Sequence, residues 1–421
     1  MSAGASDGQP GKRPLVRVEE HLARVLHGIG PLAPLDLTLG DAHGCILAED
    51  VVSEVDLPAF DNSSMDGYAV RLADVEGASE ETPAVIPVVG DIAAGSASPY
   101  RVQPGFTARI MTGAPFPPGA EAVVPIEWTD GGISSVRITR TPDEGAYVRR
   151  RGEDVARGEP ILSAGTRLGP NQIGLLAAVG RSRVVVRPRP RVVVMSTGSE
   201  LVNPGEPVGE GQITDSNSWM LTAAAREAGA LAFNVGIVPD DPRTLLGAIE
   251  DQLIRADLVV TTGGVSMGAY DVVKDVLSRL GTVQFDKVAM QPGMPQGFGT
   301  VGPDATPIIT LPGNPVSAYV SFEVFVRPVL RRMLGVEPLH RPTVRAVCQE
   351  AFRSPGGKRQ FARGHLDVED GRYVVRPVGG SGSHLVGDLA QANALIVVPE
   401  EVTEVPVGGT VNVMVLERRA S

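Results

Sequence analysis

The sequence predicts a multidomain α/β protein with a mostly parallel, doubly wound α/β domain, an inserted β-rich domain, a small helical or mixed N-terminal domain and a C-terminal all-β domain. Three observations support this. Strand-like apolar runs alternate with amphipathic helical runs over 190–337. The 50 glycines and 35 prolines are densest over 57–189, a composition typical of short strands and tight turns. Short alternating apolar runs between glycine-rich turns follow residue 340.

A length of 421 residues is enough for roughly two to four domains. We expect a disordered lead-in over 1–14, an N-terminal linking domain formed by 15–56 and 155–189, an inserted β-rich domain over 57–154, the α/β domain over 190–337 and the C-terminal β domain over 338–421.

Apolar side chains recur at helical spacing from Leu15 to Ile29 and predict a first amphipathic helix. The segment PNQIGLLAAVG predicts a second helix that ends at Gly180, followed by a strand over 184–186. In the α/β domain we expect strands at 192–195, 233–238, 258–260 and 307–311, and helices at 218–227, 242–254, 272–280 and 315–334. Ligands of such sheets bind beyond the carboxyl ends of the strands.

The net charge of −11 argues against nonspecific binding to nucleic acid, which depends on many basic side chains. Local basic runs, such as 149–151, are either a solvated face or part of a basic cleft. No apolar run approaches the roughly eighteen residues that cross a membrane, and residues 1–14 lack the apolar segment and small-residue cleavage site expected of a secretory signal. With Cys45 and Cys348 fitting no metal-binding spacing, we expect a cytoplasmic protein with two reduced, buried thiols.

Three polar loops follow predicted strands and should meet around one ligand. The stretch 261–271, TTGGVSMGAYD, offers Gly263 and Gly264 for close approach of the backbone to a phosphate, and Asp271 at a helix start. The stretch 311–315, LPGNP, offers Asn314 as a helix cap and Pro315 as the first helical residue. The third loop is STGSE, at 196–200.

Six motifs in one order resemble the molybdopterin molybdenumtransferases, the bacterial MoeA type that also occurs as the gephyrin E domain. They are DNSSMDGYAVR at 61–71, RIMTGAPFPPGAEAVV at 109–124, RRRGED at 149–154, STGSEL at 196–201, TTGGVSMGAYD at 261–271 and LPGNPVSA at 311–318. The resemblance extends from about residue 15 to the C-terminus. GGVS with a following Asp is shared with the molybdopterin adenylyltransferases, whereas DNSSMDGYA discriminates best.

The resemblance implies a late step of molybdenum cofactor synthesis, in which molybdate enters the dithiolene of adenylylated molybdopterin and AMP is released with the help of Mg²⁺. It also implies a homodimer with shared active sites and a molybdopterin adenylyltransferase as the upstream partner. Asp271 would belong to the nucleotide and pterin pocket of one subunit, and Asp66 and Thr112 to the part of the other subunit that reaches over it.

Carried onto this sequence, the resemblance gives Asp66, Thr112, Glu200 and Asp271 as catalytic residues, with Asp66, Glu200 and Asp271 as candidate Mg²⁺ ligands. The expected substrate-binding residues are Asp154, Ser196, Thr197, Gly198, Asp240, Gly263, Gly264, Ser266, Lys274, Lys287, Pro312, Gly313, Asn314, Pro315, Ser317, Arg363 and Ser383.

Each acid also has a purely structural interpretation. Asp66 precedes Gly67 and could cap a turn, and Asp271 could be only the N-cap of its helix. Thr112 and Glu200 could be ordinary turn residues. Asp154 could form a surface ion pair with the basic run 149–151. Asp240 is followed by a better helix start, Asp241-Pro242, which leaves its carboxylate available for a ligand.

The sequence departs from the family pattern at a basic loop. Many relatives read KPGKP where this chain has QPGMP at 291–295, so that Gln291 and Met294 replace two lysines. Ser199 also stands where an acid is frequent. The transferase therefore has one alternative, a catalytically weakened paralogue that binds molybdopterin or scaffolds cofactor transfer.

Overall fold

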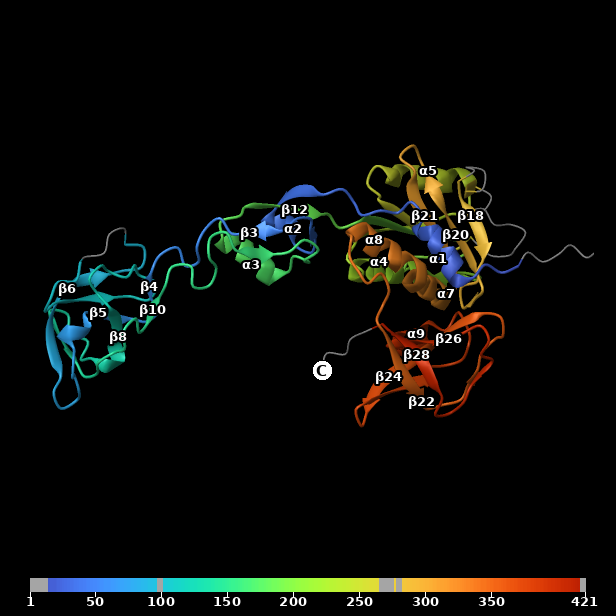
Figure 1. Cartoon of the computed structure of the whole chain (residues 1–421). Helices are drawn as coiled ribbons and strands as arrows, with labels where there is room; N and C mark the ends of the chain where they lie inside the picture. The colour runs from blue at the N-terminus through green and yellow to red at the C-terminus, as the bar shows by residue number, and fades with distance from the viewer. Residues whose placement is uncertain (1–13, 97–100, 265–275, 278–281, 417–421) are drawn as a thin grey trace, which may run out of the picture. The chain divides into compact units, whose positions relative to one another are not determined.

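The computed structural model describes residues 14–96, 101–264, 276–277 and 282–416 (Figure 1). The chain forms two compact units. The first comprises Met1–Leu35, Gly44–Ile46 and Arg187–Ser421, and the second comprises Asp36–His43 and Leu47–Val186. Cys45 and Cys348 are both buried, as predicted. Within the described residues, no helix combines the length and the apolar character that crossing a membrane requires.

The first unit contains a six-stranded sheet in the order β16-β13-β17-β21-β20-β18. Its strands are β13 (Arg191–Thr197), β16 (Leu231–Val238), β17 (Leu258–Thr262), β18 (Gln284–Lys287), β20 (Pro295–Val301) and β21 (Thr306–Leu311). The first four strands of this order are parallel, which confirms the predicted doubly wound sheet. The last two strands, β20 and β18, pair antiparallel and extend the edge of the sheet; they were not predicted from the sequence.

Helices cover both faces of this sheet. Successive side chains of a strand point to opposite faces, and in the central strands the side chains on both faces are apolar and must be buried. Val192 and Val194 of β13 pack with α4 (Asn217–Glu227) and with the continuous run α7 (Pro315–Ser321), η3 (Phe322–Val326, a π-helical turn) and α8 (Arg327–Leu334). Val193 and Met195 face the other way, towards α5 (Pro242–Leu253). Figure 1 shows α5 on one side of the sheet and α4, α7 and α8 on the other. The predicted helix at 272–280 lies almost entirely outside the described residues.

The first predicted helix is α1 (Val18–Leu26), which packs against α8 and η3. The buried side of α1 includes His21, whose Nδ1 lies 3.0 Å from Asp286 Oδ2. That carboxylate also accepts a hydrogen bond from Arg24 at 3.1 Å. His21, followed by Arg24, holds the pKa of the Asp286 carboxyl below its usual range.

The C-terminal region is a closed β structure. Its sheet runs in the order β19-β24-β25-β22-β28-β26, and β24 pairs with β26 as well, which closes the ring. The strands are β19 (Met290–Gln291), β22 (Thr343–Cys348), β24 (Arg359–Glu369), β25 (Arg372–Pro377), β26 (Ala394–Val398) and β28 (Thr410–Val415), with the short helix α9 (Val386–Gln391) beside them. The predicted all-β region after residue 340 is thus confirmed.

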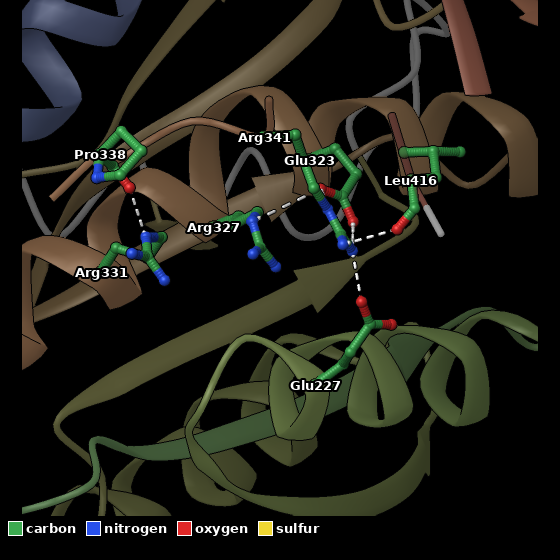
Figure 2. A network of polar contacts seen from close by, with 7 residues as sticks. All are labelled: Glu227, Glu323, Arg327, Arg331, Pro338, Arg341 and Leu416. Carbon is green, nitrogen blue, oxygen red and sulfur yellow. Dashed lines mark hydrogen bonds and ion pairs between the residues drawn. The ribbon is translucent and has the colours of Figure 1, made fainter. Parts of the chain in front are cut away.

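A buried network of charges joins this region to the α/β domain (Figure 2). The Glu323 carboxylate in η3 is fully buried and accepts hydrogen bonds from Arg341 at 2.9 and 3.0 Å. Arg341 also donates to Leu416 O and Glu227 Oε1, both at 2.6 Å. The second arginine, Arg327, lies 3.9 Å from Glu323. One buried carboxylate therefore anchors the segment after α8 and the end of β28.

The second unit contains a five-stranded sheet in the order β8-β5-β7-β6-β9. Its strands are β5 (Gly67–Val70), β6 (Ala84–Ile92), β7 (Thr107–Ile110), β8 (Ala122–Pro125) and β9 (Ser135–Ile138). Gly67 must be a glycine because a Cβ there would lie 2.0 Å from Val124 O. The unit also contains the predicted helix α3 (Pro170–Ala178), which Gly180 follows with φ +79°. The predicted strand at 184–186 is β12 (Arg183–Arg187), which pairs between β1 (Leu35–Thr38) and β2 (Ile46–Leu47).

Two chain segments connect the five-stranded sheet to the region that contains α3 and β12. Each pairs with the other through short strands and through ion pairs. The pairs are β4 (Asn62–Ser63) with β10 (Val148–Arg149), and β3 (Val51–Val52) with β11 (Pro160–Leu162). In the basic run, Arg150 lies 2.8 Å from Asp61 and Arg151 lies 2.6 Å from Asp56. These two arginines therefore brace the connecting segments.

Candidate functional site

A cavity of about 600 Å³ opens at the carboxyl ends of β13, β17 and β21. The position follows from the topology, because the chain leaves β13 for β16 on one side and returns to β17 on the other, which leaves a crevice between the diverging connections. The cavity collects most of the predicted substrate-binding residues of this domain, together with Glu200, which was predicted as a catalytic residue. These are Ser196, Thr197, Glu200, Asp240, Gly263, Gly264, Pro312, Gly313, Asn314, Pro315 and Ser317.

The glycines allow the three loops to approach one another closely. Gly263 has φ +94°, and a Cβ on it would lie 2.3 Å from Thr197 O. Its N–H donates to Leu311 O at 3.1 Å. The Cβ position built on Gly313 is only 3.5 Å from Gly263 Cα. Backbone rather than side chains thus forms this wall of the cavity, as in other sites that hold phosphates.

Two carboxylates flank the STGSE turn. Glu200 folds back over Gly198, where a Cβ would lie 2.6 Å from the Glu200 carboxylate. Asp240 Oδ2 lies 3.4 Å from the N–H of Ser199. The adjacent Asp241 caps α5 by accepting from Thr244 N at 2.8 Å. Asp240 is consequently not needed as the cap and lines the cavity, as the sequence suggested.

The C-terminal region contributes to the same cavity through the loop that carries Ser383 and His384. Asn314 occupies the N-cap position of α7, and Pro315 begins the helix as predicted. The Asn314 side chain makes no capping bond; its Nδ2 donates instead to Ser383 Oγ at 2.8 Å. Ser383 O accepts from Val316 N at 3.0 Å, and His384 lines the cavity.

Asp66 and Thr112 lie together in the second unit. Asp66 Oδ1 accepts hydrogen bonds from the N–H of Thr112 at 2.7 Å and from its hydroxyl at 2.9 Å. These donors, the backbone N–H foremost, hold the pKa of the Asp66 carboxyl below its usual range. The bonds join positions 46 residues apart, so Asp66 ties two loops together rather than serving only its own turn.

Other predicted site residues lie elsewhere. The guanidinium of Arg363 is buried and donates to three backbone carbonyls, those of Val378, Gly380 and Gly382. It therefore organises the glycine-rich loop after β25. Lys287 ends β18, and Asp154 is exposed, with its N–H donating to Leu57 O at 3.0 Å. Ser266, Asp271 and Lys274 lie outside the described residues.

A smaller cavity of about 230 Å³ lies beside that loop. Gln291, Gln360 and Arg363 are among its lining residues. Gln291 is one of the two positions at which the sequence was predicted to depart from the family pattern, and it lies on the wall of this cavity.

The residues of the main cavity fit a magnesium ion that is bound partly by substrate. Within the described part of the chain, no group of three or more His, Cys, Asp or Glu side chains could hold a metal. Mg²⁺ is commonly held by one or two carboxylates together with substrate phosphates. Glu200 and Asp240 supply carboxylates of that kind on the cavity wall.

Several residues of the cavity were not predicted from the sequence. Asp215 and Asn217 precede and begin α4, and Thr262 ends β17. A signal was available in TDSNS at 214–218, since such a cluster of Thr, Asp, Ser and Asn marks a helix start. It follows the two-residue strand β15 (Ile213–Thr214), too short for a strand pattern to stand out.

A doubly wound sheet with glycine turns and carboxylates around the crevice at its carboxyl edge is typical of α/β proteins that bind phosphorylated ligands. Residues 16–180 match the MoeA N-terminal region (domain I and II), 193–332 a probable molybdopterin binding domain, and 345–416 the MoeA C-terminal region (domain IV).

Relatives and a solved structure of the same family are similar to this chain over most of its length. Molybdopterin molybdenumtransferase 2 of Mycobacterium tuberculosis is 48% identical over 397 residues, covering 93% of this chain and 97% of the relative. The molybdopterin molybdenumtransferase of Bacillus subtilis is 36% identical, covering 96% and 95%. The crystal structure of the molybdopterin biosynthesis MoeA protein from Pyrococcus horikoshii superposes with a TM-score of 0.76 at 32% identity, covering 96% of this chain and 100% of that one. The chain belongs to the molybdopterin molybdenumtransferase family.

Proposed function

We propose that this transferase of molybdenum cofactor biosynthesis inserts molybdate into the dithiolene of adenylylated molybdopterin and releases AMP, with Mg²⁺ assisting. The observation that carries the proposal is the cavity at the ends of β13, β17 and β21, where glycine turns face the carboxylates Glu200 and Asp240. A ligand with a phosphoanhydride suits this arrangement because backbone N–H groups receive phosphate oxygens and carboxylates receive a divalent cation.

Mg²⁺, when bound, would neutralise charge that develops on the phosphoryl oxygens as the phosphoanhydride breaks. The chain's own residues position the substrate. The turns at Gly263 and Gly313 bring backbone against the phosphates, and Ser317 at the start of α7 adds a hydroxyl. Asp271 and Lys274 are further proposed ligands of the pterin nucleotide.

We further propose a homodimer in which Asp66 and Thr112 of one copy complete the cavity of the other. The hydrogen bonds from Thr112 keep Asp66 ionised and fixed, which suits a carboxylate that must meet a cation or orient a water on a partner. A molybdopterin adenylyltransferase is the proposed upstream partner, and the cytoplasm the proposed compartment.

The test of the reaction is to incubate purified protein with adenylylated molybdopterin, molybdate and Mg²⁺, and to follow AMP and the molybdenum-loaded cofactor. AMP release that depends on the protein and on Mg²⁺ is expected. Absence of AMP would refute the transferase proposal.

The test of the shared site is to mix two inactive variants, Asp66→Ala and Asp240→Ala. Hybrid dimers would contain one cavity with both acids intact, so the mixture should recover up to about a quarter of wild-type activity. Sedimentation of differently tagged subunits would establish that they exchange. Exchange without recovery would refute a site built from two copies.

A further inference from the structure

The main cavity is lined by a buried amide that the proposed chemistry does not yet use. Asn217 is the first residue of α4 and is only 8% exposed. Its Nδ2 donates to Gly313 O at 2.7 Å and to Thr262 Oγ1 at 3.0 Å. The amide nitrogen is thus committed to the loops at the ends of β17 and β21.

The partners of Asn217 fix which way its amide points. A backbone carbonyl can only accept a hydrogen bond, so the nitrogen must face Gly313. Thr262 gives its own hydroxyl proton to Pro312 O at 2.9 Å and therefore accepts from Asn217. The amide oxygen is left over: among the described residues, Asn217 Oδ1 is buried without a hydrogen-bond partner. A buried acceptor without a partner lowers stability, and a donor on a ligand would remove that cost.

A second acceptor lies two positions before it. Asp215 is 3% exposed; its Oδ1 accepts from Ser196 Oγ at 2.8 Å and Ser218 N at 3.2 Å, and its Oδ2 accepts from Ser218 Oγ at 2.5 Å. Asn234 Nδ2 donates to the same Ser218 hydroxyl at 3.0 Å. An ionised carboxylate offers about four acceptor positions, so at least one remains for a ligand.

Asn217 Oδ1 and the Asp215 carboxylate can bind only a part of a ligand that donates hydrogen bonds. No lysine or arginine is present among the described residues that line this cavity. A phosphate or molybdate oxygen would be repelled by Asp215 and could give nothing to Asn217 Oδ1. The N–H groups of a heterocycle are donors, and the 2-amino-4-oxopyrimidine ring of a pterin presents an amine beside a ring N–H.

We infer that Asn217, supported by Asp215, is a specificity-determining residue that accepts a hydrogen bond from the 2-amino-4-oxopyrimidine edge of the pterin, while the glycine turns receive the phosphates. The inference rests on the proposed function, because it assigns one half of that substrate to one wall of the cavity. Adenine also carries an amine, so the test must separate the pterin from the nucleotide.

The test measures binding of three probes to the full-length protein: pterin-6-carboxylate, lumazine-6-carboxylate, in which an oxo group replaces the 2-amino group, and AMP. Wild type should bind the pterin about ten-fold more tightly than the lumazine, the effect of one net hydrogen bond. Asn217→Ala should bind the pterin about ten-fold more weakly and should no longer distinguish the two pteridines. Because the Gly313 and Thr262 loops also lose a hydrogen-bond donor, its affinity for AMP should fall as well, but by less than its affinity for the pterin. Asn203→Ala, which alters an exposed asparagine, should behave as wild type.

The comparison of ligands on wild-type protein needs no substitution, so it stands even if Asn217→Ala folds poorly. Equal affinity of wild type for both pteridines, or an Asn217→Ala variant that loses AMP rather than pterin affinity, would overturn the inference. Wild type that releases AMP but does not discriminate would refute this inference alone. Discrimination without AMP release would support the pterin contact while refuting the proposed reaction.

Discussion

Replacement of Gly263 by alanine tests whether the glycine turn after β17 builds the cavity. Two effects oppose the substitution. The backbone has φ +94°, which an L-residue adopts at a cost of about 1–2 kcal/mol. The new Cβ would also lie 2.3 Å from Thr197 O, a backbone atom that cannot rotate away. Overpacking of this kind costs about 1–3 kcal/mol more.

Gly205→Ala is the matched control. Gly205 has φ +92°, nearly the same backbone conformation, and nothing lies within 4 Å of the Cβ position. This variant should lose only the conformational contribution, about 1–2 kcal/mol, whereas Gly263→Ala should lose about 2–5 kcal/mol. Urea unfolding followed by circular dichroism measures the difference.

The functional consequence should be larger than the structural one. Relief of the contact requires the loop at Gly263 or the strand end at Thr197 to shift, and a displacement of about 1 Å in a positioning loop can cost about 100-fold in rate. We therefore expect AMP release to fall by about 100-fold in Gly263→Ala and to stay within about two-fold of wild type in Gly205→Ala. Equal stability and equal activity of the two variants would refute the role assigned to the close approach.

Three further predictions concern other sites. Glu323→Gln should reduce the free energy of unfolding by about 3–5 kcal/mol, because Arg341 and Arg327 would lose the buried carboxylate between them and Arg341 would keep only the exposed Glu227 as a charge partner; a melting temperature equal to that of wild type would contradict the network in Figure 2. Thr112→Val should raise the pKa of Asp66, measured by NMR, yet leave it below the usual range because the N–H donor remains. Since that lowered pKa stabilises the folded state at pH values above the ordinary carboxyl pKa, and the contribution disappears as the pH falls through the folded-state value, the destabilisation by Thr112→Val should vanish in acid; destabilisation that persists there would contradict the pairing. Gln291→Lys should lower the molybdate concentration for half-maximal activity about five-fold, as expected of roughly 1 kcal/mol from one partly exposed charge, and an unchanged value would mean that the neutral wall of the smaller cavity does not matter.

The fold class was predictable because each region of the chain carries a pattern that local physics enforces. The buried strands β13 and β17 are continuous apolar runs that end in polar turns, and helices such as α5 begin with a capping acid and a proline. The antiparallel strands β18 and β20 escaped prediction for different reasons: β18 has only four residues, and two glycines interrupt β20. Their pairing is decided by the neighbouring strands, β20 for β18 and β21 for β20, rather than by their own patterns.

Residues of the candidate site could be predicted from the sequence where few structural roles explain a residue of that type at that position. Gly263 and Asp240 line the cavity, and the sequence predicted both as ligand-binding residues, because one is a glycine after a buried strand and the other an acid beside a better helix cap. Asn217 could not, since its importance lies in which of its amide atoms lacks a partner, and that depends on Thr262 and Gly313, which lie 45 and 96 positions away. The same holds for Arg363, whose donors prove to be occupied by backbone carbonyls.

The central claim is that cleavage of the phosphoanhydride and insertion of the metal are coupled in one reaction at the main cavity, which lies at the carboxyl ends of β13, β17 and β21. The most direct measurement is a single turnover with protein in excess over adenylylated molybdopterin, in which AMP and molybdenum-loaded cofactor are quantified in the same samples. We predict that one AMP appears for each cofactor loaded, and that Asp240→Asn slows both products equally. Cofactor formed without AMP, or AMP formed with no molybdenum inserted, would contradict the account.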